Sequence, residues 1–485
     1  MFDILEADIV IMQELKIQRK DLQDDMVLVP GWDCYFSLPK HKKGTSARDV
    51  QGSTYLHWLG YSGVGIYTRQ SSCAPIRAEE GILGVLSAPG KSVSYRDLPD
   101  NERIGGYPSL SQISDLDVDA MSLDAEGRCI VLEFPAFVLL GVYSPANSSG
   151  MRDDYRHAFL SALDIRIRNL DKIGKRVILT GDLNVSRDER DTAGAEEDKQ
   201  KMGITHDEYI STPNRRIFNQ LLEDGEVIGE RDEGREHPVL WDILRGFHPT
   251  RKRMYTHWEQ KINARPGNYG SRIDHILCSV SMKDWFQEAN IQEGLMGSDH
   301  CPVYAVLKDE VELDGAKMNL FDIMNPPGIF ENGRRVREIT IKDHPPFSGK
   351  LMPEFEKRRS IKDMFKPRER LPAREPPQPS SPTAALVVAT VPDTVGEKLQ
   401  SSEHGSGELN EPVQEPLGPK TANKFKRDRV NENIPKAKRP KSSALEAKSS
   451  SKDQTTLRNF FKSRTPTPSN TVSPRAKRKT CLDSH

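Results

Sequence analysis

The segment Arg176-Val-Ile-Leu-Thr180 runs directly into Gly181-Asp182-Leu183-Asn184. An apolar run that ends in turn-forming residues is typical of a buried strand, and the glycine with the two polar residues marks the turn that ends it. The same arrangement, an apolar run followed at once by polar side chains, recurs along the first 310 residues. This pattern indicates a β-rich core whose strand ends carry the polar groups.

Residues 1–310 are predicted to form many strands with few helices between them. Two sheets packed face to face and flanked by helices are therefore favoured over a regular parallel sheet in which every strand is followed by a helix. Apolar runs predict the strands, and the helical spacing of apolar residues predicts the helices. The expected strands are Ala7–Met12, Gly63–Tyr67, Phe137–Tyr143, Arg176–Thr180, Ile273–Cys278 and Val303–Leu307, and the expected helices are Arg152–Ile173 and Ile217–Leu222.

The charge of the 485 residues is distributed unevenly, although the formal net charge is only −1. Residues 351–485 carry 27 Lys and Arg against 16 Asp and Glu, whereas residues 1–350 have a net charge of −12. Every tryptophan and tyrosine precedes Val306, and the later sequence is rich in Pro, Ser, Lys and Glu. Such a composition buries too little apolar surface to offset its ordering entropy. We expect a folded domain over 1–310, a linker over 311–350 and a disordered basic tail over 351–485.

Composition also indicates the cellular compartment in which the protein is expected. No apolar run approaches the roughly 18 residues that a membrane helix needs, and the N-terminus lacks the basic-then-apolar order of a signal peptide. The six cysteines form no C-x-x-C pair, which disfavours a disulfide framework and a cysteine-rich zinc site. These features favour a reducing compartment, the cytosol or the nucleus, and predict no membrane partner.

Five of the strand ends carry residues suited to metal-assisted phosphodiester hydrolysis. Glu14 follows the apolar run that ends at Met12 and can offer a hard cation such as Mg²⁺ an oxygen ligand. Asp182 and Asn184 can hold an attacking water from two sides. Taken alone, an Asp-x-Asn sequence after a strand is more often simple turn chemistry.

The remaining candidates are Tyr143, Asp274 and His300, with Asp299 beside the histidine. A tyrosine hydroxyl can donate to a phosphoryl oxygen, and an Asp–His pair keeps an imidazole charged or in one tautomer beside the phosphate. Tyr143 alone is more often a rim aromatic, and Asp274 with its neighbour is more often a structural pair. Their joint occurrence at the ends of apolar runs favours the catalytic interpretation.

Eight short motifs resemble the exonuclease–endonuclease–phosphatase superfamily, and within it the class II AP endonucleases related to exonuclease III. The resemblance spans residues 3–307, and Asn263-Ala-Arg265 followed by the Asp274 and His300 segments is its most specific part. The motifs are Gln13–Lys16, Tyr61–Gly65, Asp124–Arg128, Tyr143–Asn147, Gly181–Asn184, Trp258–Arg265, Arg272–Leu277 and Gly297–His300.

The resemblance implies a four-layer α/β sandwich that depends on Mg²⁺, or on Mn²⁺ as an alternative. It implies incision of double-stranded DNA 5′ to an abasic site, together with 3′-phosphodiesterase and 3′→5′ exonuclease activity, in a nuclear and monomeric enzyme. By motif, the implied metal ligands are Glu14, Asp182, Asn184, Asp299 and His300. The implied catalytic residues are Tyr143, Asp182, Asn184, Asp274 and His300, and the implied DNA contacts are Asn147, Trp258, Arg265 and Arg272.

One departure from the family concerns the start of the chain. The family begins with a strand that ends in a metal-binding Asn within a W-N-x-x-G segment, and that strand is not found here. We therefore expect Asp8–Met12 to lie at an exposed edge and the metal to lack one ligand. The group that acts as the catalytic base is left open.

The tail contains a second recognisable pattern. Residues 454–461 resemble a sliding-clamp (PCNA) binding box, in which Gln454 fills a polar notch while Leu457, Phe460 and Phe461 form an apolar plug. The basic clusters 424–429, 436–441 and 475–479 suit nuclear localisation, contact with the DNA backbone, or both. Clamp-associated eukaryotic AP endonucleases usually end in a zinc-binding module, which is not expected here because Cys481 is the only tail cysteine.

Two other functions remain open at this point. The first is a phosphatase of the same fold that acts on inositol phosphates or lipids, but such relatives have a W-C-D-R-x-L segment where this chain has Ser271-Arg272-Ile273-Asp274. The second is a non-catalytic repair scaffold bound to the clamp, which only the unmatched first strand suggests.

Overall fold

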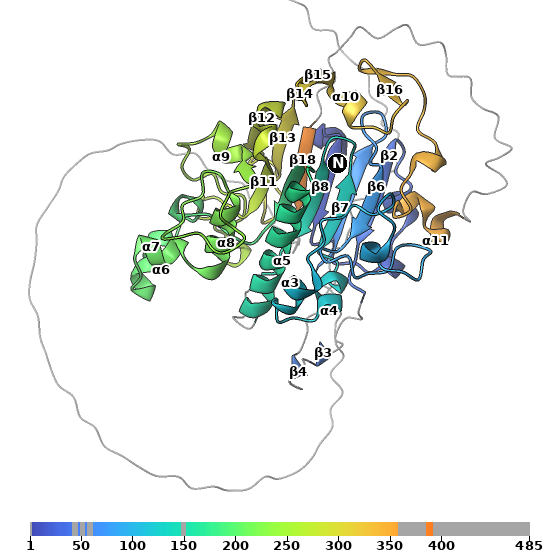
Figure 1. Cartoon of the computed structure of the whole chain (residues 1–485). Coiled ribbons are helices and arrows are strands. Elements are labelled where there is room, and N and C mark those ends of the chain that lie inside the picture. Colours follow the sequence, from blue (N-terminus) through green and yellow to red (C-terminus); the bar gives the residue numbers. More distant parts are fainter. Residues whose placement is uncertain are drawn as a thin grey trace, which may run out of the picture. The chain divides into compact units, whose positions relative to one another are not determined.

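The computed structural model describes residues 2–40, 62–146 and 152–356, together with the short strands β3 (Ala47–Arg48), β4 (Thr54–Tyr55) and β18 (Ala385–Thr390). The chain divides into two units, and all described residues belong to the unit formed by residues 1–394 and 455–485. Two six-stranded sheets form the body of this unit (Figure 1). The sheet that we call sheet A has the order β12 (Phe286–Ile291), β13 (Val303–Leu307), β18, β1 (Ile9–Gln13), β5 (Val64–Arg69) and β2 (Trp32–Ser37).

The second sheet, sheet B, has both parallel and antiparallel neighbours. Its strands β8 and β9 are parallel, and its other pairs are antiparallel. Its order is β10 (Leu240–Asp242), β11 (Asp274–Ser279), β9 (Val177–Asp182), β8 (Val138–Tyr143), β7 (Cys129–Glu133) and β6 (Arg77–Glu80). The helices are α1 (Phe2–Leu5), α2 (Asp24–Val27), α3 (Leu110–Ser114), α4 (Ala120–Ala125), α5 (Asp153–Lys172), α6 (Ala195–Met202), α7 (His206–Ile210), α8 (Pro213–Leu221), α9 (Ile243–Phe247), α10 (Leu320–Ile323) and α11 (Pro353–Glu356).

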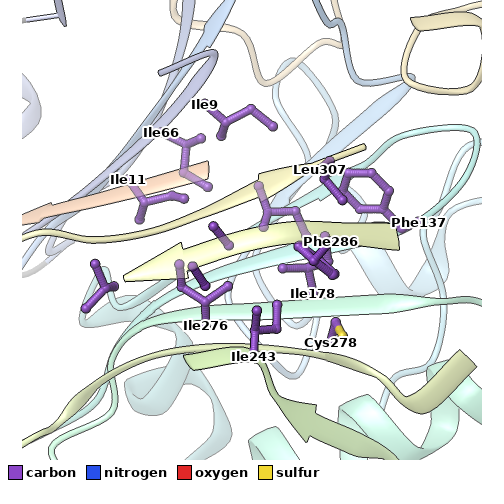
Figure 2. Packing of buried hydrophobic residues seen from close by; sticks show 14 of the residues in the cluster. Ile9, Ile11, Ile66, Phe137, Ile178, Ile243, Ile276, Cys278, Phe286 and Leu307 are labelled. Carbon is purple, nitrogen blue, oxygen red and sulfur yellow. The ribbon is translucent and has the colours of Figure 1, made fainter. Parts of the chain in front are cut away.

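Side-chain alternation along the strands builds three apolar layers. Ile11 of β1 and Ile178 of β9 lie in the core between the two sheets (Figure 2), because alternate residues of a strand face the same side. Their neighbours face outwards: Leu179 packs in the cluster that α5 and α8 share with sheet B, and Met12 packs in the cluster under α2 and α11. Helices therefore cover the outer face of each sheet, and the predicted four-layer α/β sandwich is confirmed.

Each predicted strand and helix is found, with small shifts at the ends. The predicted strand Ala7–Met12 corresponds to β1, which begins two residues later, and the predicted helix Arg152–Ile173 corresponds to α5. The expected exposed edge at β1 is wrong. This strand has β5 on one side and β18, from the predicted tail, on the other.

The predicted linker over residues 311–350 is also corrected by the structure. Residues 310–356 fold back onto the domain as the hairpins β14 (Glu310–Leu313) with β15 (Ala316–Asn319) and β16 (Phe330–Glu331) with β17 (Arg334–Arg335), followed by α11. Met352 and Phe355 enter the outer apolar cluster, and the His344 imidazole lies 2.6 Å from the buried Asp33 carboxylate of β2. These apolar side chains supply the burial that a linker lacks, so the folded unit extends at least to Glu356.

Among the described residues, no helix is both long enough and apolar enough to cross a lipid bilayer.

The close approach of β8 and β9 generates a stability prediction. Gly181 has φ +137°, and a Cβ atom there would lie 1.9 Å from the Val142 carbonyl oxygen. We expect Gly181→Ala to lower the free energy of unfolding by about 3 kcal/mol, because the backbone of one strand must move. Gly294→Ala is the matched control, since a Cβ at Gly294 meets no atom within 4 Å. Urea denaturation measures both, and equal stabilities would contradict this packing.

Candidate active site

Strand register brings three of the predicted residues side by side at one rim of sheet B. Tyr143 pairs with Asp182 across the parallel strands β8 and β9, and Asp182 pairs with Asp274 across β9 and β11. Asp182 and Asp274 each lie an even number of residues from Ile178 and Ile276, which face the core between the sheets. The side chains of this row therefore point to the end of the inter-sheet core, where the polar groups of β1 can reach them.

Glu14 joins this row from the other sheet. It directly follows β1 and adopts φ +51°, which turns the chain away from the strand direction. The Tyr143 hydroxyl donates to the Glu14 carboxylate, and the Lys16 ammonium lies 3.1 Å from its other oxygen. The site is therefore shared by sheets A and B, and Lys16 adds a positive charge that the sequence analysis had not assigned.

His300 and Asp274 form the buried ion pair of the site. The His300 Nδ1 atom lies 2.8 Å from Asp274 Oδ2, and both side chains are almost inaccessible to solvent. Burial alone would lower the pKa of His300, but the charge and hydrogen bond of Asp274 raise it to about 10. Burial also opposes ionisation of Asp274, yet the His300 charge lowers the pKa of this carboxyl. His300 is therefore a cation at neutral pH.

Asp182 lies beside this pair in a different electrostatic environment. Its pKa is raised well above the ordinary value, first by burial and then by the nearby Asp274 charge. Asn184 fixes the carboxyl: its backbone N–H donates to Asp182 Oδ1 at 2.9 Å, and its side-chain amide donates to Oδ2 at 3.1 Å. Asn184 adopts φ +50°, a conformation that asparagine tolerates better than most residues. The Gly-Asp-Leu-Asn turn therefore holds a carboxyl group with high proton affinity in one orientation.

The loop that carries Asp299 and His300 is held from behind by Arg265. The Arg265 guanidinium donates to the carbonyl oxygens of Ser298 and Leu295 at 2.7 Å each and stacks over the Trp258 ring. Trp258 is itself buried, and its backbone N–H donates to the Asp299 carbonyl at 2.8 Å. Both residues were expected to contact DNA, but their described contacts support the loop.

Arg272 lies too deep to reach DNA. It is fully buried, and its guanidinium donates to Asp191 and Asp242 at distances from 2.8 to 3.2 Å. Arg245 donates to the same Asp191 at 2.5 Å. This network gives Arg272 a structural role, so we do not retain the expected DNA contact. Asn147 lies outside the described residues.

Besides Lys16, two further site residues escaped the sequence analysis. The His257 ring lies 4.6 Å from the His300 ring, and burial together with the His300 charge lowers the pKa of His257. The sequence offered one signal for His257, which directly precedes Trp258, the first residue of the Trp258–Arg265 motif. Arg156 of α5 donates to the Asn184 carbonyl and so braces the turn after β9. Only the packing of α5 against sheet B reveals this contact.

The donor set fits a hard cation such as Mg²⁺. Within the described residues, no group of three or more His, Cys, Asp and Glu side chains is placed to hold a metal ion. Mg²⁺ commonly uses only one or two carboxylates and completes its shell with water and substrate phosphate. Gln13, next to Glu14, is fully buried with both amide atoms unpartnered, and Asp274 Oδ1 is likewise buried and unpartnered. These two unpartnered oxygens, one next to Glu14 in the chain and one in the Asp274–His300 pair, are acceptors that a hydrated cation can complete.

The described contact of His300 bears on its predicted metal-ligand role. Nδ1 lies 2.8 Å from Asp274 Oδ2, so Nε2 is the nitrogen that remains for another partner. The metal-ligand role stays a prediction, whereas a protonated ring carries a proton on each nitrogen and offers a positive charge and an N–H donor at the rim.

The His300–Asp274 pair predicts a specific titration. The His300 pKa in the folded chain is raised above its ordinary value of about 6.5, so the stabilisation is complete below pH 6.5 and is lost as the pH rises through about 10. We expect NMR of ¹³C-labelled histidine to place the His300 midpoint near pH 10 in the metal-free chain. Asp274→Asn should move it below 7, because burial then dominates. Asp314→Asn, at an exposed carboxylate, is the control, and a wild-type midpoint below 7 would contradict the pairing.

Comparison with known proteins agrees with this geometry. The sequence profile of the Endonuclease/Exonuclease/phosphatase family matches residues 3–300. Proteins named DNA-(apurinic or apyrimidinic site) endonuclease 2 are 39% identical over 327 residues in Schizosaccharomyces pombe and 38% identical over 348 residues in Saccharomyces cerevisiae. The matches cover 66% and 64% of this chain and 55% and 62% of those relatives. The chain therefore matches little more than half the length of these curated relatives.

A solved structure is similar over a larger share of its own chain. The crystal structure of the Xenopus laevis APE2 catalytic domain is 27% identical, with a TM-score of 0.52, and the match covers 73% of this chain and 92% of that domain. The family match contains each segment of the candidate site from Glu14 to His300 and more than half of the chain. The resemblance inferred from the motifs is thus confirmed, and the chain belongs to the Endonuclease/Exonuclease/phosphatase family.

Proposed function

We propose that this chain is a divalent-metal-dependent DNA-repair nuclease. Its substrates are double-stranded DNA with abasic sites, cut on the 5′ side, and blocked 3′ ends, removed by 3′-phosphodiesterase and 3′→5′ exonuclease activity. The observation that carries the proposal is the cluster of Asp182, Asp274 and His300 at the rim where Glu14 faces Tyr143. The names of the relatives, AP endonuclease 2, support the choice of substrate.

The imidazolium of His300 suits it to bind the scissile phosphate. It can donate from Nε2 to a non-bridging phosphoryl oxygen, while Asp274 holds Nδ1 at 2.8 Å and keeps the ring charged. A positive donor fixed before the reaction stabilises negative charge that develops on the phosphoryl group. Tyr143 lies opposite Asp182 on the neighbouring strand. Its hydroxyl can give the phosphate a second hydrogen-bond donor when the Glu14 carboxylate binds another partner.

Asp182 is our choice for the group that takes the proton from the attacking water. Burial and the nearby Asp274 charge raise its pKa, which increases the affinity of the carboxylate for a proton from water. Asn184 holds both carboxyl oxygens through its two N–H donors, so the carboxyl cannot rotate freely. The P–O bond to the 3′ oxygen breaks as the bond to the water oxygen forms, and the proton that Asp182 received can return through solvent to this leaving oxygen, which becomes the 3′-hydroxyl.

We assign the Glu14 carboxylate to Mg²⁺, with Mn²⁺ as the alternative ion. Asp299, on the His300 loop, is the second candidate carboxylate. When bound, such a cation polarises the phosphoryl group and neutralises the leaving oxyanion. The protein side chains orient the phosphate, exclude water from the buried Asp274–His300 pair and move the proton.

One assay separates the candidate functions. A 5′-labelled abasic duplex and an inositol phosphate are offered separately with Mg²⁺ and with EDTA. Cleavage of the duplex that requires Mg²⁺ and leaves a 3′-hydroxyl supports the proposal. Release of phosphate from the inositol substrate alone favours the phosphatase, and no turnover of either substrate favours the scaffold.

Two substitutions test the assigned catalytic roles. We expect Asp182→Asn and His300→Ala each to lower the rate of abasic-site cleavage at least about 100-fold, the usual loss when a general base or an electrostatic stabiliser is removed. Cleavage rates are measured at saturating substrate, and circular dichroism checks that each variant is folded.

The matched controls are Asp314→Asn and His206→Ala, at exposed or partly exposed positions outside the site. Both controls should cleave at nearly the wild-type rate. A folded Asp182→Asn or His300→Ala variant that does the same would remove that residue from the mechanism.

The tail extends the proposal to recruitment. Residues 454–461 lie outside the described residues, so the clamp box remains a proposal from sequence, in which Gln454, Leu457, Phe460 and Phe461 bind a sliding clamp (PCNA). We propose that a monomeric enzyme is brought to nuclear DNA in this way during base excision repair, with the basic clusters acting as nuclear signals or DNA contacts.

Binding of a tail peptide tests this recruitment. A peptide of residues 454–464 should bind the clamp in calorimetry, and replacement of Phe460 and Phe461 by alanine should abolish binding, since buried hot-spot aromatics contribute about 2 kcal/mol or more each. The full-length double variant should keep its clamp-independent cleavage. Unchanged affinity of the alanine peptide would show that the pattern is a coincidence.

A further inference from the structure

Two of the sequence motifs, Asp124–Arg128 and Tyr61–Gly65, supply no residue to the proposed reaction. Both nevertheless adjoin the pair that Tyr143 and Glu14 form across the two sheets. The Tyr143 backbone N–H donates to the Arg128 carbonyl oxygen at 2.9 Å, and the first two backbone N–H groups after Glu14 donate to the carbonyl oxygens of residues 63 and 62 at 3.1 and 3.0 Å. The two motifs are therefore bonded directly to the two segments that meet at the site.

The Arg128 guanidinium contacts Tyr143 in two ways. It lies over the Tyr143 ring, 4.9 Å from the ring centroid, and its Nη1 atom donates to the Tyr143 carbonyl oxygen at 3.2 Å. Both side chains are buried, so little water screens the attraction between the cation and the ring. The hydroxyl of the same ring donates to Glu14. The guanidinium therefore holds the ring whose hydroxyl projects into the site.

The Glu126 carboxylate holds the guanidinium in turn. Arg128 Nε donates to Glu126 Oε2 at 2.5 Å, and the Arg152 guanidinium donates to Oε1 at 2.5 Å. The Glu126 side chain is only 3% exposed, and a buried carboxylate is costly unless cations and hydrogen-bond donors pair with it. Because the guanidinium is planar, it can bond this carboxylate through its edge while its face covers the Tyr143 ring.

The backbone of Glu126 reaches the other half of the site. Its carbonyl oxygen accepts from the Ser62 hydroxyl at 2.5 Å, and the Ser62 carbonyl oxygen accepts from the Lys16 backbone N–H at 3.0 Å. Glu14 and Lys16 adopt φ +51° and +54°, a conformation that residues other than glycine keep only where surrounding contacts hold it. Glu126 therefore supports the Glu14 segment as well as Tyr143.

We propose that Glu126 and Arg128 are positioning residues of the site, and that their buried ion pair orients the Tyr143 ring so that its hydroxyl can donate to the substrate phosphate. This inference rests on the proposed function, which supplies the phosphate. It gives the Asp124–Arg128 motif a role that a purely structural ion pair would not have, because the pair acts on the reaction through one hydroxyl group.

A double-mutant cycle tests whether Arg128 acts through Tyr143. Arg128→Met removes the cation but keeps a side chain that can pack on the ring, and Tyr143→Phe removes only the hydroxyl. We expect each substitution to lower kcat for abasic-site cleavage at least about 10-fold with little change in KM, because a donor to the phosphate is lost or displaced. The double variant should match Tyr143→Phe within about 2-fold, since residues that act as a unit are not additive. Losses that multiply would overturn the positioning role.

Two further variants separate positioning from folding. Glu126→Gln combined with Arg128→Met replaces the ion pair by neutral side chains, so that no buried carboxylate loses its partner, and it should show the same loss of kcat. Arg77→Met is the matched control, because Arg77 bonds Glu133 at 2.7 Å at the opposite end of β7. This control should keep a kcat near the wild-type value. A loss as large as that of Arg128→Met would overturn the proposal, since any broken ion pair on β7 would then have the same effect.

NMR of ¹³C-labelled tyrosine measures the orientation without DNA or metal. The Tyr143 Cζ signal, assigned with Tyr143→Phe, reports the hydrogen bond that the hydroxyl makes to Glu14. The neutral-pair variant, Glu126→Gln with Arg128→Met, should move this signal toward its position in Glu14→Ala, where the hydroxyl has lost its acceptor. Arg77→Met should leave the signal unchanged. An unmoved signal in the folded neutral-pair variant would overturn the positioning role.

These measurements distinguish the positioning role from the nuclease assignment. A wild-type chain that cleaves no abasic DNA would overturn the proposed function, whatever the NMR signal shows. A wild-type chain that cleaves the duplex, with losses that multiply in the double variant, would overturn the positioning role and leave the proposed function intact.

Discussion

The candidate site depends on the register of three neighbouring strands in sheet B. A shift of one residue between β9 and β11 would turn Asp182 or Asp274 from the inter-sheet rim to the helix-covered face. The apolar residues behind them, such as Ile178 and Ile276, hold the register because the same shift would expel them from the core. The packing that stabilises the sandwich is therefore also what aligns the carboxyl groups.

That alignment creates the electrostatics of the site. Two carboxyl groups at adjacent, buried strand positions cannot both be ionised without a large cost in electrostatic free energy. His300 pairs with Asp274 and favours the ionised form of this carboxyl, while Asp182 keeps a high proton affinity. One buried cluster thus holds a cationic N–H donor beside a carboxyl group of high proton affinity, and the pairing with His300, rather than residue type, distinguishes the two aspartates.

A buried ion network supports the loops behind the site. Arg272, just before β11, joins Asp191 to Asp242 of β10, and the Arg272 charge helps to lower the pKa of both carboxyls although burial opposes it. Loss of the arginine would leave two uncompensated buried charges, which is strongly destabilising even though such a pair adds little net stability by itself. The network therefore fixes how the chain enters β11, and with it the position of Asp274.

The sequence by itself determined the strands that end in polar residues, because apolar runs and turn residues are local signals. It also determined the identity of the rim residues Tyr143, Asp182, Asp274 and His300. It could not reveal β6, which reads Arg-Ala-Glu-Glu. Both glutamates of this strand are buried, and Glu79 accepts a hydrogen bond from Arg166 of α5. A local sequence pattern cannot identify such partners because they lie far away in the chain.

Tertiary structure alone decided the roles of the arginines and the extent of the folded unit. Arg265 and Arg272 stand in motifs whose resemblance implied DNA contact, yet only packing shows that one holds a loop and the other is fully buried. Residues 311–350, predicted as a linker, and the first residues of the predicted tail join the folded unit, where Met352 and Phe355 pack in the outer apolar cluster of sheet A. The run at 385–390 acquires a strand's hydrogen bonds only from β1 and β13, because a strand, unlike a helix, obtains its hydrogen-bond partners from residues remote in sequence.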